Sequence, residues 1–281
     1  MTTGRKARTT GRRGSISPSL PVITLLTDFG TADYFVGAVK GAILSVNPLA
    51  VIADITHEIP PQDVAAGAFT LLAAYKTFPA GTIHVAVVDP GVGSTRRAII
   101  VSANEQFFVG PDNGLFTYIY DREPSHQTFH VTSDLHFRPS PSTTFHGRDI
   151  FAPVAAALSS GVALETFGQL IDDEVRLEQS LEPVVQKDGK VRARIIHIDR
   201  FGNCILNITR DLIDSKKQPT LLIKRRLIRT FKTFYADEIG SPNEPFAIWG
   251  SAGFLEISMN GQSAAQKLKA KRADVVILNR G

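Results

Sequence analysis

Three clusters of polar side chains directly follow apolar stretches that are typical of buried strands. TDFGTADYF places Asp28 and Asp33 after VITLL, DPGVGSTRR follows TIHVAVV, and TFHGRDIF places His146 before an expected helix. Open α/β sheets bind ligands at the carboxyl ends of their strands. We therefore expect a ligand site where these clusters meet.

The second cluster holds an acid and a permanent cation on either side of a glycine-rich turn. Asp89 and Arg96 are seven residues apart, and the intervening loop can fold them toward one another. Together with the imidazole of His146 they could orient and activate a water molecule. Read alone, DPGVG is also a plain chain reversal, because Pro90 fixes φ and the glycines admit positive φ.

A phosphate-binding loop does not fit this turn. GVGSTRRA lacks the spacing and the lysine of G-x-x-x-x-G-K-[ST]. Arg96 stands where the dinucleotide fingerprint needs its third glycine, and the chain continues into a strand instead of a helix. The turn is therefore a chain reversal or a reaction site.

Other candidate residues have two readings each. Asp28 is either a turn or N-cap aspartate or a carboxylate that binds hydroxyl groups. DRFGN, from Asp199 to Asn203, is either a hairpin turn or a ligand-binding turn. We expect four residues to be structural, the last two of them packed within a β-domain: His57, His84, His197 and Cys204.

Composition and charge exclude several function classes. The first 20 of the 281 residues hold five basic residues and no acid, so the remaining 26 basic residues face 27 acidic ones. A slightly acidic body does not favour nucleic-acid binding.

The basic segment has no apolar core of a secretory signal, and no apolar run reaches the roughly 18 residues of a membrane span. A single cysteine indicates a reducing cytoplasm and neither a disulfide nor a multi-cysteine zinc site.

Strand-like and helix-like stretches alternate in the first part of the chain. We expect strands at 22–26, 50–55, 82–89, 97–103 and 106–111, and helices at 33–47, 62–78 and 147–161. An acidic, proline-marked linker at 170–185 precedes strand-like segments with one short helix at SAAQKLKA. This pattern predicts a disordered tail at 1–20, a mainly parallel α/β sandwich domain at 21–180 and a small β-barrel domain at 184–281.

Six motifs occur together in order: LLTDFG, DITHEIPPQDVAAGAF, VVDPGVGSTRRAI, GPDNGLF, FHGRDIFAP and DRFGN. Over about residues 21–280 the chain thereby resembles the S-adenosyl-L-methionine (SAM) hydroxide adenosyltransferases, adenosine-forming hydrolases related to fluorinating and chlorinating enzymes. The resemblance implies an N-terminal α/β domain, a C-terminal β-barrel and a homotrimer. Its active sites would lie between the N-terminal domain of one subunit and the C-terminal domain of its neighbour.

The resemblance also implies a role for nine residues. Asp89, Arg96 and His146 would activate the water. Asp28 would bind the ribose of the substrate, and Phe201 and Asn203 would bind its adenine. At the methionine part, Asp199 would bind the amino group, Ser251 would bind the carboxylate, and Asp33 would lie nearby. SAM is the substrate here, and neither a cofactor nor a metal is implied.

Departures from the halogenating relatives favour a hydrolase. Asp89 replaces their tyrosine, and a halide pocket would not tolerate that anion. Gly147 replaces the serine that faces the halide in fluorinases, and their insertion after RRAII is absent. Ala252 stands where relatives often carry an arginine for the methionine carboxylate, so Ser251 would act there without it.

The expected reaction needs no acid for the leaving group, because the sulfonium of SAM is already activated. An oxygen nucleophile held in line with C5′ would give adenosine and L-methionine with inversion. Three alternatives remain: a SAM-dependent halogenase, a non-catalytic SAM- or adenosine-binding module, and a metal-dependent hydrolase.

Overall fold

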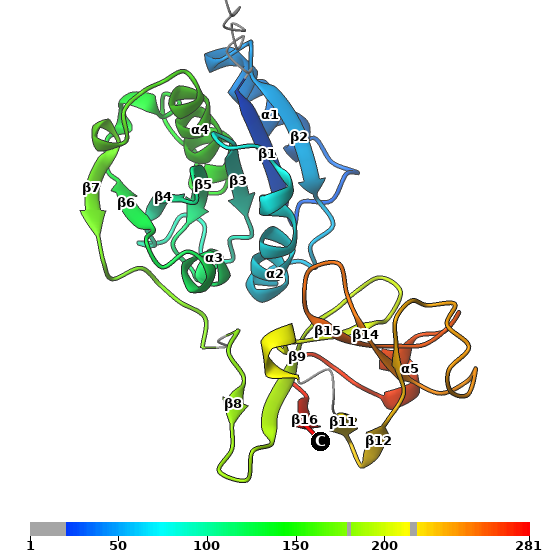
Figure 1. The fold of residues 1–281 in the computed structure, drawn as a ribbon. Helices are drawn as coiled ribbons and strands as arrows, with labels where there is room; N and C mark the ends of the chain where they lie inside the picture. The colour runs from blue at the N-terminus through cyan, green and yellow to red at the C-terminus, as the bar shows by residue number, and fades with distance from the viewer. Residues whose placement is uncertain (1–20, 179–180, 214–217) are drawn as a thin grey trace, which may run out of the picture.

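The computed structural model describes residues 21–178, 181–213 and 218–281. It contains a seven-stranded sheet with helices, followed along the chain by a nine-stranded sheet (Figure 1). The predicted α/β architecture with a second, β-rich part is confirmed. The basic segment 1–20, expected to be disordered, lies outside the described residues.

The seven-stranded sheet is parallel in one half and antiparallel in the other. Its order is β2-β1-β3-β5-β4-β6-β7, with parallel pairing as far as β5 and antiparallel pairing beyond it. The direction changes because a tight hairpin joins β4 to β5: Asn104 and Glu105 both have positive φ, as two-residue hairpins require. The strands are β1 (Val22–Thr27), β2 (Val51–Thr56), β3 (Ile83–Val87), β4 (Ala98–Ala103), β5 (Gln106–Pro111), β6 (Gln127–Val131) and β7 (Gly168–Ile171).

Helices cover both faces of this sheet. Helices α1 (Phe35–Val46) and α4 (Ala152–Ser159) pack on one face, and α2 (Val64–Ala74) and α3 (Thr117–Arg122) pack on the other. Side chains alternate along β3: Ile83 and Val85 enter the first core, and Ala86 enters the second. The predicted sandwich therefore has a core on each side of the sheet.

The nine-stranded sheet curls on itself. Among the described residues no pairing joins the end strands β12 and β13, so the predicted barrel is a half-barrel. The linker predicted at 170–185 is shorter than expected, because its two ends are strands β7 and β8. The strands are β8 (Val184–Val185), β9 (Val191–Ile198), β10 (Cys204–Leu206), β11 (Thr220–Ile223), β12 (Arg226–Ile228), β13 (Phe231–Lys232), β14 (Phe246–Trp249), β15 (Leu255–Ser258) and β16 (Val275–Asn279), with helix α5 (Ala264–Leu268).

The two parts of the chain share a contact through α2. Phe69 of α2 stacks on His197 of β9 with ring centroids 4.7 Å apart. Arg272 donates to Asp63, the N-cap of α2, at 2.6 Å. Cys204 is buried within the β-part, as expected. His197 lies on β9 as expected, but its ring is not packed within the β-part alone, because it stacks on Phe69 of α2.

His84 should make the protein less stable in acid. Its side chain is fully buried, and burial lowers its pKa from 6.5 to about 4. The unfolded chain therefore takes up this proton first, and stability is lost as pH falls from about 6.5 toward 4, by roughly 3 kcal/mol. Denaturant unfolding at pH 7 and pH 4.5 measures this loss. In His84→Gln the free energy of unfolding should differ less between the two pH values than in the wild type. An equally large difference in the variant would contradict the assignment of this loss to His84.

Candidate active site

Two adjacent parallel strands bring Asp28 and Asp89 to one edge of the sheet. Strand β1 ends at Thr27 and β3 ends at Val87, so both carboxylates follow carboxyl ends of paired strands. They line a cavity of about 400 Å³ together with His146. The same cavity is also lined by Phe29 and Phe145, whose rings pack edge to face with centroids 5.8 Å apart. The three sequence clusters therefore meet as expected.

Arg96 joins Asp89 to His146. Its Nε donates to both carboxylate oxygens at 3.0 Å, and its Nη2 donates to Oδ2 at 2.6 Å. The same Nη2 lies 2.7 Å from Nδ1 of His146. Only 10% of the arginine and 5% of the aspartate side chain is exposed, so the pair is shielded from solvent.

This geometry decides which ring nitrogen of His146 carries the proton. A guanidinium only donates, so Nδ1 must accept, and the neutral ring carries its hydrogen on Nε2. His146 therefore presents a donor to the cavity, not a free base. Of the three residues expected to activate the water, only Asp89 has acceptor capacity left, because Arg96 and the Nε2–H of His146 are donors.

Burial and the positive charge of Arg96 hold the pKa of His146 below its usual 6.5, against the opposing pull of Asp89 and Asp149. The ring is therefore neutral near pH 7. We expect activity to fall on acidification only below pH 6.5, when the incoming proton breaks the contact with Arg96. A pH profile of kcat/KM checks this, with His126→Asn, remote from the cavity, as a control. An acidic limb above pH 6.5 that persists in His146→Gln would contradict it.

The turn between Asp89 and Arg96 is both a chain reversal and part of the site. Gly93 has φ of +78°, and a β-carbon placed there would lie 2.2 Å from the carbonyl oxygen of Thr143. The Oγ of Ser94 donates to the carbonyl of Gly91 at 2.6 Å and accepts from the backbone of Arg96 at 3.2 Å. The glycine thus lets the turn pack against the segment that carries His146.

Asp149, which the sequence reading did not single out, fixes that segment. It is 2% exposed and accepts from the backbone of Ser142 at 2.9 Å and from Arg148 at 2.7 Å. His146 immediately precedes a π-helical turn, Gly147–Phe151, where an unbroken α-helix was expected. Such turns often occur at functional sites.

The two other predicted residues of this half differ in their placement. Asp28 is not a helix N-cap: its Oδ2 accepts from the backbone of Gln62 at 2.8 Å, and α1 begins only at Phe35. Asp28 lines the cavity. Asp33 is exposed and lines neither of the two cavities discussed here.

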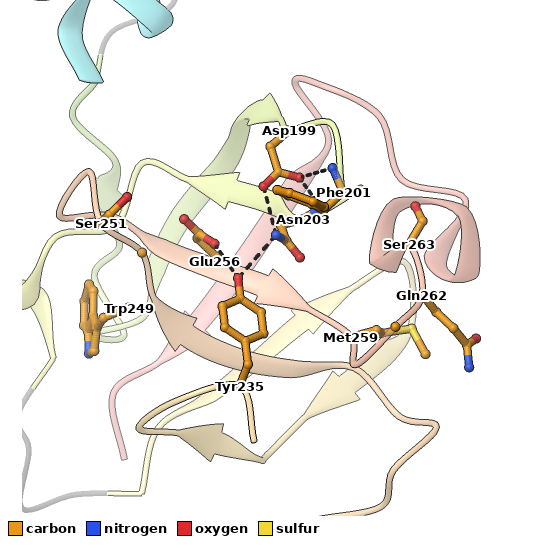
Figure 2. Close-up of a pocket in the computed structure, with 12 residues that line it drawn as sticks. Asp199, Phe201, Asn203, Tyr235, Trp249, Ser251, Glu256, Met259, Gln262 and Ser263 are labelled. Carbon is orange, nitrogen blue, oxygen red and sulfur yellow. Dashed lines mark hydrogen bonds between the residues drawn. The ribbon is translucent and has the colours of Figure 1, made fainter. Parts of the chain in front are cut away.

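A second cavity, of about 710 Å³, opens on the half-barrel (Figure 2). It contains the four remaining predicted residues: Asp199, Phe201, Asn203 and Ser251. DRFGN is thus a turn between β9 and β10 that also lines a cavity. The Oδ1 of Asp199 accepts from the backbones of Phe201 at 3.0 Å and Asn203 at 2.8 Å.

Hydrogen bonds orient the amide of Asn203. Its Nδ2 donates to Asp199 at 2.8 Å and to the hydroxyl of Tyr235 at 3.3 Å. Both amide hydrogens are then used, so its carbonyl oxygen is left as an acceptor. The exocyclic amino group of adenine is a donor of the matching kind. Phe201, 77% exposed, presents a ring on which a base can stack.

Several residues that line this cavity were not predicted from the sequence. Glu256 is a single carboxylate within the otherwise apolar stretch FLEI, a pattern that could have drawn attention to it. Tyr235 offers no such signal, because the surrounding loop is rich in polar residues. Further lining residues are Trp249, Met259, Gln262 and Ser263.

Seven of the nine predicted residues therefore line two cavities that share no lining residue, and Arg96 is hydrogen-bonded to two residues of the smaller one. Across 21–178, 181–213 and 218–281, no three His, Cys, Asp or Glu side chains are grouped in a way that could hold a metal ion. No helix in the described part of the chain is long and apolar enough to cross a membrane.

Comparisons with known proteins match this division. Residues 23–168 match the SAM hydroxide adenosyltransferase N-terminal domain, and residues 193–277 match the SAM hydroxide adenosyltransferase C-terminal domain. The (R)-S-adenosyl-L-methionine hydrolase of Methanocaldococcus jannaschii is 37% identical over 267 residues, which cover 92% of this chain and 95% of that protein. The fluorinase of Nocardia brasiliensis is more distant, 28% identical over 94% of this chain and 96% of that enzyme.

A solved structure is also similar. An uncharacterized conserved protein from Thermotoga maritima superposes with a TM-score of 0.83 at 36% identity, and the match covers 92% of this chain and all of that one. Both halves, their order and their residues agree with a single family. The chain belongs to the SAM hydroxide adenosyltransferase family.

Proposed function

We propose that this protein hydrolyses S-adenosyl-L-methionine to adenosine and L-methionine. The observation that carries the proposal is the shielded Asp89–Arg96–His146 arrangement at the edge of a cavity. The name of the Methanocaldococcus relative specifies the R form of SAM, and we extend that preference to this chain.

The geometry assigns each group a task. A water beside Asp89 gives its proton to the carboxylate while Nε2–H of His146 holds the water oxygen. That oxygen attacks C5′ opposite the sulfur, and the C5′–S bond breaks with both electrons going to sulfur, which leaves as neutral methionine thioether. The proton taken by Asp89 is then released to solvent. Arg96 holds both partners in position through its hydrogen bonds.

Isotope labelling tests the reaction. Incubation with SAM in ¹⁸O-water, without halide and with a chelator present, should give adenosine carrying ¹⁸O at its 5′ oxygen. Chiral labelling at C5′ should show inversion; retention would exclude direct displacement. Activity lost to the chelator would favour a metal-dependent hydrolase, and bound but intact SAM would favour a non-catalytic module.

A halogenase is the less favoured alternative. The similarity to fluorinases is lower than that to the hydrolase, and Asp89 places a negative charge in the cavity. Added chloride or fluoride should give no halogenated nucleoside.

We further propose that the active sites form between subunits of a homotrimer. Three of the nine predicted residues line the smaller cavity of one chain and four line its larger cavity, and aromatic side chains lie exposed near both: Tyr34, beside Phe35, is 68% exposed, and Phe201 is 77% exposed. Closing one cavity on the neighbour's other cavity would bury them. The lone buried cysteine, Cys204, accords with a cytoplasmic protein.

Mixing two inactive variants tests the shared site. Asp89→Asn damages one half and Asn203→Ala the other, so an exchanged assembly should regain about a quarter of wild-type activity. Each variant alone should stay inactive. Failure to regain activity, with exchange of subunits demonstrated, would place the whole site in one chain.

A further inference from the structure

Glu256 lines the larger cavity, the one on the half-barrel. It lies on β15, and its side chain occupies the space beside Gly250, which directly follows the paired strand β14: a β-carbon at Gly250 would come within 1.7 Å of its Oε1. Gly250 is therefore the residue that admits this carboxylate. Figure 2 shows Glu256 directed toward the same space as Ser251 and Tyr235.

The two carboxylates of this cavity differ in spare acceptor capacity. Asp199 already accepts three hydrogen bonds, from the backbones of Phe201 and Asn203 and from the Asn203 amide. A carboxylate has about four acceptor positions, so about one remains. Within the described part of the chain, Glu256 accepts one hydrogen bond, from Tyr235 at 3.4 Å, so about three remain.

The negative charges of Glu256 and Asp199 also favour a bound cation in this cavity. Burial, and then the neighbouring Asp199, raise the pKa of Glu256. Two carboxylates close together in a half-buried cavity repel each other unless a cation lies between them. The proposed substrate carries such a cation, a primary ammonium with three hydrogens to donate.

We propose that Glu256 binds the α-ammonium group of the substrate and determines specificity for the amino acid portion. Asp199 then chiefly holds the DRFGN turn and gives one further contact. Asn203 donates to Asp199 and to Tyr235, and Tyr235 donates to Glu256 (Figure 2). The amide proposed to bind the base and the carboxylate proposed to bind the ammonium group therefore belong to one hydrogen-bonded chain. This inference rests on SAM being the ligand.

Glu256→Gln tests the inference, because it removes the charge and keeps the shape. The loss of a charge-assisted contact should raise KM for SAM about 10- to 100-fold and change kcat little. Glu256→Asp, which keeps the charge, should recover part of the affinity. Glu244→Gln, an exposed glutamate outside the cavity, is the matched control.

A deaminated SAM analogue separates a binding role from a structural one. In an Asp89→Asn background, where turnover is expected to be about 10²- to 10⁴-fold slower, calorimetric titration should show a large loss of affinity from Glu256→Gln for SAM and almost none for the analogue. Equal penalties for both ligands, or none for either, would overturn the inference. The proposed function fails separately: the parent protein would then bind SAM and release no adenosine.

Discussion

Asp89→Asn should lower the turnover of SAM about 10²- to 10⁴-fold, the usual range for a lost proton acceptor. The amide has the shape of the carboxylate but cannot take a proton from water. Its amino group would also face the Arg96 guanidinium, which now donates three times to Asp89. Arg96 then keeps an uncompensated charge next to His146 in a shielded place.

Adenosine release measured by chromatography gives the turnover, and calorimetry shows whether SAM still binds. Asp173→Asn is the matched control: this aspartate pairs with the adjacent Arg97 at 2.6 Å, but 71% of its side chain is exposed and it lines neither cavity. It should retain wild-type activity. If the turnover of Asp89→Asn stays within threefold of wild type, Asp89 is not the group that accepts the proton from water.

Gly93→Ala should lower activity about 100-fold and destabilise the fold. The added methyl group would have to lie 2.2 Å from the carbonyl oxygen of Thr143, and its residue would need φ of +78°. The turn and the 143–146 segment must then separate, which pulls Arg96 away from His146. Misplacing catalytic groups by about 1 Å costs about 10²-fold.

Gly81→Ala separates the effect of the close contact with Thr143 from the effect of the left-handed backbone conformation. Gly81 has nearly the same φ, +80°, but open space at the β-carbon position. It should show only the cost of the left-handed backbone, about 1–2 kcal/mol, and keep its activity. Equal effects of both substitutions on activity would mean that the close approach to Thr143 does not position the site.

Local patterns predicted most elements of the first sheet. Strands β1 to β5 and helices α1, α2 and α4 lie close to their expected ranges, because apolar runs bounded by turn residues give a strong signal in the sequence. The reversal of direction at β4 was not predicted. Its cause is a two-residue turn, Asn104–Glu105, which lacks the glycine that usually marks such hairpins.

The sequence by itself determined the family, the order of the two parts and the residue types of the reaction, because motifs and strand ends are local properties. Only the tertiary structure decided which atoms meet. Arg96 occupies Nδ1 of His146, so Asp89 is left as the acceptor. Glu256 enters the cavity because Gly250, six residues earlier and directly after the paired strand β14, leaves room for it. Donor direction and close packing depend on segments that are distant along the chain, so no local pattern records them.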